Sequence, residues 1–143
     1  MRKSLLLIFC AATAVSAVPQ TVVRVPEGVV RRVAKTVVMP EYPSTSKKRR
    51  TQGLAVVAVD IDERGDVTGV AVIEAPDEDI GKSVITAVKQ WKFSELTAEG
   101  KPARLQGKLS FYFRITRGKA RVSNPEKFAE LGLTDGGGQN RLR

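Results

Sequence analysis

The sequence contains no histidine and only one cysteine, and these absences narrow the chemistry open to the chain. The single cysteine, Cys10, lies in the apolar leader, so the remainder has neither imidazole nor thiol. Histidine triads, thiol nucleophiles and most zinc ligand sets are therefore excluded. The acidic residues of the 60–66 segment lack the spacing of a calcium loop. We expect a protein that is not an enzyme, with no cofactor, no metal and no small-molecule substrate.

A long hydrophobic run is also missing. The chain opens with Arg2 and Lys3, an apolar stretch from Leu5 to about Ala14, and the small-residue sequence Val15-Ser-Ala17. This apolar stretch is much shorter than the about 20 residues that a helix needs to cross a bilayer. The pattern predicts a signal peptide at 1–17 that is removed on export to the periplasm. Retention as an anchor and lipidation at Cys10 are the alternatives.

Acidic residues are in the minority, with 15 Asp and Glu against 24 Lys and Arg. Without Arg2 and Lys3 the balance is 22 against 15, which leaves a net charge of +7. Such a charge favours an anionic envelope surface as a partner, and export argues against nucleic acid. The densest basic patch is the run Lys47, Lys48, Arg49 and Arg50. It is either a solvated helical turn or a surface for electrostatic steering.

The regular elements predict an α+β domain. The segment 54–62 is apolar and β-branched, and Gly65 separates it from a second such segment, 67–74, so the two form a hairpin. Apolar residues recur at helical spacing from Ile80 to Trp91, with Asp77 or Asp79 as the N-cap and Trp91 in the core. The order β-β-α-β gives a three-stranded antiparallel sheet with one helix packed on one face.

The last strand, 104–117, alternates strictly between apolar and polar residues. Its outward residues are Lys108, Ser110, Tyr112 and Arg114. Beyond it, the tail 118–143 contains the pattern of a short helix after Ser123 or Asn124, followed by a disordered end. We expect that helix to fold back on the second face of the sheet.

Several positions together resemble the C-terminal domain of the TonB family. The resemblance extends from about Tyr42 to Ile115. The residues between Val22 and Tyr42 also resemble the segment that precedes this domain in the family. The expected domain is therefore 22–117. It rests on the order and spacing of Tyr42-Pro43, Gly53, Asp60, Gly65, Trp91-Lys92-Phe93 and Gly100. The sequence departs from the family pattern at Ser94, where a proline often stands, and in having only Pro19, Pro26 and Pro40 between residues 18 and 41.

This resemblance implies a periplasmic module that captures an extended segment, the TonB box, of an outer-membrane receptor by pairing it with a sheet edge. The family counterpart of 104–117 is the accepting edge, so the expected partner-binding residues are Lys108, Ser110, Tyr112 and Arg114. Tyr42 and Pro43 either lie beside the incoming segment or only begin the domain.

The function expected from the sequence is therefore peptide capture by strand addition in TonB-dependent transport. One alternative is an envelope structural protein that binds peptidoglycan or anionic lipid through its basic surface. A second alternative is a self-associating domain whose exposed strand pairs with its own copy in a homodimer.

Overall fold

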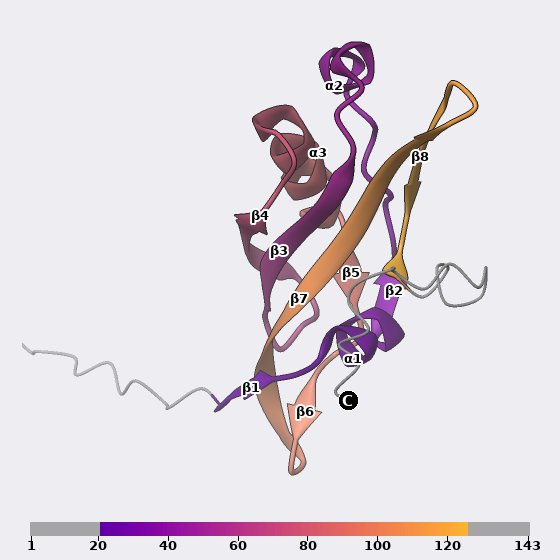
Figure 1. Cartoon of the computed structure of the whole chain (residues 1–143). Coiled ribbons are helices and arrows are strands. Elements are labelled where there is room, and N and C mark those ends of the chain that lie inside the picture. Colours follow the sequence, from indigo (N-terminus) through magenta and orange to yellow (C-terminus); the bar gives the residue numbers. More distant parts are fainter. Residues whose placement is uncertain (1–20, 126–143) are drawn as a thin grey trace, which may run out of the picture.

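The computed structural model describes residues 21–125, and the sheet in it is organised around one long strand (Figure 1). This strand is β7, Lys101–Thr116, which pairs antiparallel with β3, Gly53–Ile61. On its other side β3 pairs with β4, Val67–Glu74. The hairpin expected around Gly65 and the third strand of the β-β-α-β pattern are both present. They form the centre of the domain.

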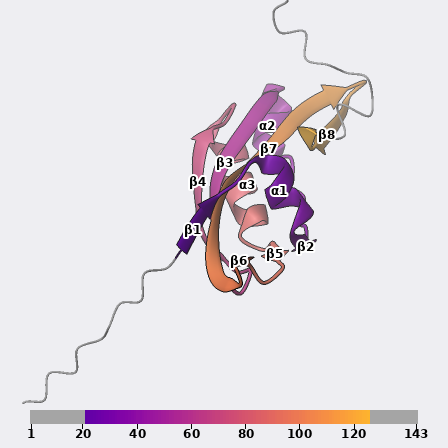
Figure 2. The ribbon, with the colours of Figure 1, turned by 90° about the horizontal axis from the view of Figure 1, so that it is seen from below.

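One helix, α3 at Glu78–Val88, covers the apolar face of these three strands. Asp77 is its N-cap, as expected, and accepts a hydrogen bond from the amide of Ile80 at 2.8 Å. The core side chains come from alternate positions of β3 and β7 and from the apolar side of α3. The α+β fold with a helix packed on one face of the sheet is therefore confirmed, and Figure 2 shows the helices on one side of the curved sheet.

Further strands enlarge the expected three-stranded sheet and make it mixed. β1, Thr21–Arg24, runs parallel to β7, whereas β8, Lys119–Ser123, returns antiparallel beside it. β6, Thr97–Ala98, also pairs with β7, and β2, Ala34–Thr36, pairs with β5, Lys92–Phe93, in a small separate sheet. The sheet thus extends past residue 117 into the expected tail. The predicted tail helix lies outside the described residues.

Two short helices complete the described part, and both lie near the ends of strands. α1, Glu27–Arg32, packs against β7 and places Val30 in the core. α2, Ser44–Arg49, precedes β3 and is the short exposed helix expected for the basic run. Within residues 21–125 no helix has both the length and the apolar character needed to cross a bilayer.

The glycine of the β3–β4 turn has a packing role that links two motifs. Gly65 adopts a φ of +86°, and a Cβ at this position would lie 2.2 Å from the carbonyl oxygen of Phe93. The amide of Phe93 donates to the carbonyl of Gly65 at 2.9 Å. The turn therefore lies directly against the Trp91-Lys92-Phe93 segment, which only glycine permits. Trp91 is buried, as expected, and its indole N–H donates to the carbonyl of Val38 at 2.8 Å.

Candidate functional site

The outer edge of β7, the side that faces away from β3, carries the backbone groups of the expected docking residues. Because β-strand residues alternate in direction, the N–H and C=O groups of Gln106, Lys108 and Ser110 all point to this side. Those of Phe111 point to β3, where it pairs with Ala55. The outer edge is thus the surface on which an added strand would form its ladder.

The first part of this edge is occupied by β1. Thr21 to Arg24 lie parallel to Ala103 to Gln106, and the amide of Val25 continues the ladder by donating to the carbonyl of Gln106 at 3.0 Å. The side chains of Arg24 and Gln106 also meet, at 3.3 Å. β1 buries little apolar surface, because the side chain of Val22 is 48% exposed. A short, weakly covered segment of the chain therefore already lies where an extra parallel strand fits.

Two side chains of α1 occupy the next position on the edge. The carboxylate of Glu27 accepts from both the amide and the hydroxyl of Ser110, each at 2.8 Å. The guanidinium of Arg31 donates to the carbonyl of Ser110 and to Glu27, both at 2.6 Å. It also lies 5.3 Å from the centre of the Phe111 ring. Glu27 and Arg31 thus satisfy Ser110 as a neighbouring strand would. Neither residue was expected at the site from the sequence, although their i,i+4 spacing is a recognisable helical signal.

β8 occupies the last part of the edge. Its register pairs Tyr112 with Ser123 and Arg114 with Arg121. Of the four outward residues expected on this strand, Tyr112 and Arg114 therefore face a neighbouring strand. Ser110 is held by α1, and Lys108 lies between the end of the β1 register and Ser110. A groove of about 580 Å³ runs past Lys108 and Ser110 and is bordered by Arg24 to Glu27.

Of the Tyr42-Pro43 pair, Tyr42 is buried in the core and Pro43 is partly exposed. Tyr42 is only 7% exposed, its ring lies edge-on to Phe113 at 5.3 Å, and its hydroxyl donates to the carbonyl of Thr51. Burial, with a further contribution from the negative charge of Asp77, raises the pKa of the Tyr42 phenol. Pro43 lies at the start of α2 and borders a groove of about 550 Å³ beside α3. The interior position of Tyr42 gives it a structural role.

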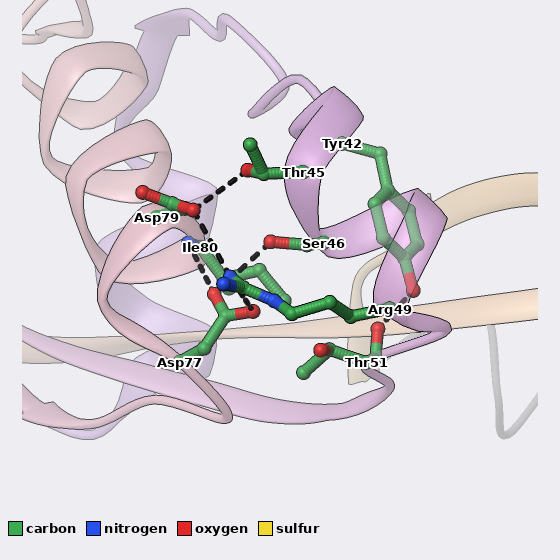
Figure 3. Close-up of polar contacts among 8 residues, drawn as sticks. All are labelled: Tyr42, Thr45, Ser46, Arg49, Thr51, Asp77, Asp79 and Ile80. Atoms are coloured by element: carbon green, nitrogen blue, oxygen red, sulfur yellow. Dashed lines mark hydrogen bonds and ion pairs between the residues drawn. The ribbon is translucent and has the colours of Figure 1, made fainter.

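The basic run of α2 joins the start of α3 through one of its four cations. Arg49 forms ion pairs with Asp77 at 3.2 Å and Asp79 at 3.0 Å (Figure 3). Thr45 donates to Asp79 at 2.6 Å, and the buried Ser46 donates to Asp77 at 3.1 Å. Lys47, Lys48 and Arg50 are exposed. Arg49 thus links α2 to α3, whereas the other three cations of the run extend into solvent.

Asp77 is the centre of this network, and its pKa is lowered. Burial acts in the opposite direction and would raise the pKa, but the hydrogen bonds together outweigh it. The donors are the amide of Ile80 and the side chains of Ser46, Thr51 and Arg49. The charged form of Asp77 therefore stabilises the contact between α2 and α3.

The opposite edge of the sheet, formed by β4, is interrupted. Two register shifts against β3 each leave an extra residue on β4, at Thr68 and at Ile73. Such bulges twist an edge and break the regular row of backbone groups that another strand needs. Ile73 is nevertheless 52% exposed. The side of β7 that faces away from β3 has no such register shifts, although β1, α1 and β8 occupy most of it.

The described residues 21–125 include no group of three or more His, Cys, Asp or Glu side chains that could hold a metal ion. Asp62 instead accepts from the amides of Arg64 and Asp66 and closes the β3–β4 turn. The fold and the strand pairing describe a small α+β domain built around one long strand that has neighbours on both sides.

Comparison with known proteins assigns this domain to a family. The family model described as Gram-negative bacterial TonB protein C-terminal matches residues 38–115. The chain therefore belongs to the TonB C-terminal domain family, as its sequence pattern indicated. This family is not a family of enzymes, so the expectation that the chain is not an enzyme is confirmed. Domains of this family act in the periplasm.

Individual relatives agree with this assignment. Two proteins named Protein TonB, from two strains of Xanthomonas campestris pv. campestris, are each 32% identical to this chain over 65 residues. That segment is 45% of this chain and 29% of each relative, so the match spans less than a third of the relatives' length. The solution structure of the Pseudomonas aeruginosa TonB C-terminal domain is similar in fold, with a TM-score of 0.51 and 24% identity. The similarity covers 60% of this chain and 88% of that one.

Proposed function

We propose that this protein captures an extended segment of an outer-membrane receptor by strand addition on the outer edge of β7, as part of TonB-dependent transport. One observation carries the proposal: β7 already accepts a short added strand, β1, in parallel on this edge. Strand addition draws most of its affinity from main-chain hydrogen bonds, and an edge that pairs with four residues of one segment can pair with another.

The incoming segment takes the place of β1 in this proposal. β1 is the weakest of the neighbours of β7, because it is short and mostly exposed, whereas β8 is tied to β7 by a two-residue turn. The groove beside Lys108 and Ser110 continues the same edge and would receive the next residues of the ligand. Tyr112 and Arg114 would pair with the ligand only after β8 separates from β7, because β8 occupies their part of the edge.

A proline pair in β1 tests this competition. The amide of Val25 faces β7, so by alternation the amide of Val23 also faces β7 and that of Val22 faces away. Val23→Pro removes one ladder hydrogen bond, about 1 kcal/mol, and should tighten capture of a synthetic receptor peptide about fivefold. Val22→Pro, the matched control, removes no ladder donor and should bind like the parent. Peptide titration by calorimetry measures both.

Equal affinity of the parent and Val23→Pro would show that β1 does not compete for the docking edge. The protein for these titrations is exported with its own leader and purified from the periplasm. Its intact mass reports at the same time whether cleavage follows Ala17, which we propose as the route to that compartment.

A further inference from the structure

The basic run of α2 lies at the same end of the sheet as a second group of cations. In the sequence the two groups are more than sixty positions apart. The β7–β8 hairpin carries Arg114, Arg117, Lys119 and Arg121. The two segments meet around the start of β3: Gly53 pairs with Phe113, and the amide of Ile115 donates to the side chain of Gln52 at 2.7 Å. Figure 1 shows α2 and the turn between β7 and β8 projecting at this end.

We call these eight residues the basic end: Lys47, Lys48, Arg49 and Arg50 on α2, and Arg114, Arg117, Lys119 and Arg121 on the hairpin. All eight are exposed. Neither 44–53 nor 114–121 contains an acidic residue. Among the described residues, Asp77 and Asp79 form ion pairs with Arg49 of this group. The basic end is therefore a concentration of positive charge assembled by the fold.

Two of these arginines occupy positions that local structure disfavours. Arg50 and Arg117 adopt left-handed backbone conformations, with φ of 56° and 51°, where glycine or asparagine is usual. Arg114 and Arg121 are directly opposite in the antiparallel pair, so their cations lie side by side on this surface. The left-handed positions of Arg50 and Arg117 lower the stability of the free domain, and both add a cation to the same surface. An anionic partner would offset these costs.

We propose that the basic end binds the anionic phospholipid headgroups of a membrane leaflet. Its cations sit on a projecting turn and a short surface helix, whereas the grooves beside α3 and β7 are lined by other residues. Long cationic side chains on a projecting surface match a flat, laterally mobile layer of negative charge. The surface is separate from the outer edge of β7, so membrane contact and strand capture can occur together. The domain would thereby be held where receptor segments emerge.

Vesicle binding tests this proposal with three matched triple variants of the exported chain. The first removes the helix cations, Lys47→Gln, Lys48→Gln and Arg50→Gln, and keeps the structural Arg49. The second removes the hairpin cations, Arg117→Asn, Lys119→Gln and Arg121→Gln, with asparagine chosen because it tolerates the left-handed conformation. The control removes three exposed cations far from the basic end: Arg64→Gln, Lys89→Gln and Lys101→Gln.

Co-sedimentation with vesicles of phosphatidylcholine and phosphatidylglycerol gives the readout. Each cation near an anionic surface is worth about fivefold in affinity, so each basic-end triple should bind about a hundredfold more weakly than the parent. The control triple should bind like the parent, and high salt should release the parent from the vesicles. Equal losses in all three triples would overturn the proposal. So would a parent that binds isolated peptidoglycan but not anionic vesicles. Circular dichroism of each variant confirms that it is folded.

Discussion

At the residue scale, the contact between α2 and α3 depends on the Asp77 carboxylate. Its oxygens receive the N-cap amide of α3, the buried hydroxyl of Ser46 and the guanidinium of Arg49 (Figure 3). Asp77→Ala should lower the free energy of unfolding by about 1–3 kcal/mol, because it removes the cap and leaves Ser46 without its acceptor. Asp77→Asn should cost less, since an amide oxygen can still cap the helix.

The pH dependence of this contribution has a definite sign. The folded-state pKa of Asp77 lies below its unfolded value, so its charge stabilises the fold fully above the ordinary carboxyl pKa of about 4. That part of the stability is lost as the pH falls through the lowered folded pKa. The difference between parent and Asp77→Asn should therefore shrink on going from pH 7 to pH 3. Urea unfolding at both values measures it, and an undiminished difference at pH 3 would contradict this account.

Single residues also show how far a sequence can predict a site. Gly65 and Trp91 were identified correctly as turn and core residues. The helix, however, ends at Val88, so Trp91 enters the core from the segment after the helix and not from its apolar face. The burial of Tyr42 was not predictable, because it depends on Phe113 and Thr51, which come together only in the fold. Glu27 and Arg31 could be seen as a helical pair, but not as partners of Ser110, which is far away in the sequence.

At the element scale, the strongly patterned segments were predicted and the short flanking strands were not. β3, β4, α3 and β7 have long apolar patterns that match their secondary structure. β1 and β8 are four and five residues long and include exposed cations, so neither has a readable period. Their pairing comes from the length of β7, which extends beyond β3 and offers backbone groups on its outer edge. Pairing of this kind between distant segments cannot be recognised from the residues of the short strands alone.

Proline substitution in β7 distinguishes its two edges. The amide of Lys108 faces the outer edge, beyond the β1 register, so Lys108→Pro should leave the domain folded but weaken capture of a receptor peptide about fivefold. Phe111→Pro should unfold the domain, because the amide of Phe111 faces β3. Circular dichroism and peptide titration separate the two effects. A folded Lys108→Pro variant that captures peptide as well as the parent would remove β7 as the docking edge.

At the scale of the whole molecule, the described domain has two surfaces with different chemistry. We propose the outer edge of β7 as the surface for an extended peptide and the basic end as the surface for an anionic layer. The fold-back of the tail helix on the second face of the sheet stays a prediction, since residues 126–143 lie outside the described part. Leu54, Val56 and Ala58 on that face are only half-buried by the described residues, so apolar surface is left there for the tail helix to cover.

In the proposed function, a receptor segment replaces β1 on the outer edge of β7. Residue-resolved amide hydrogen exchange by NMR, with and without a synthetic receptor peptide that contains the TonB box, tests it most directly. The amides of Val23 and Val25 should exchange faster when the peptide binds, while peptide protons should show contacts to Arg104, Gln106 and Lys108. Unchanged protection of Val23 and Val25, with peptide contacts confined to β4, would contradict it.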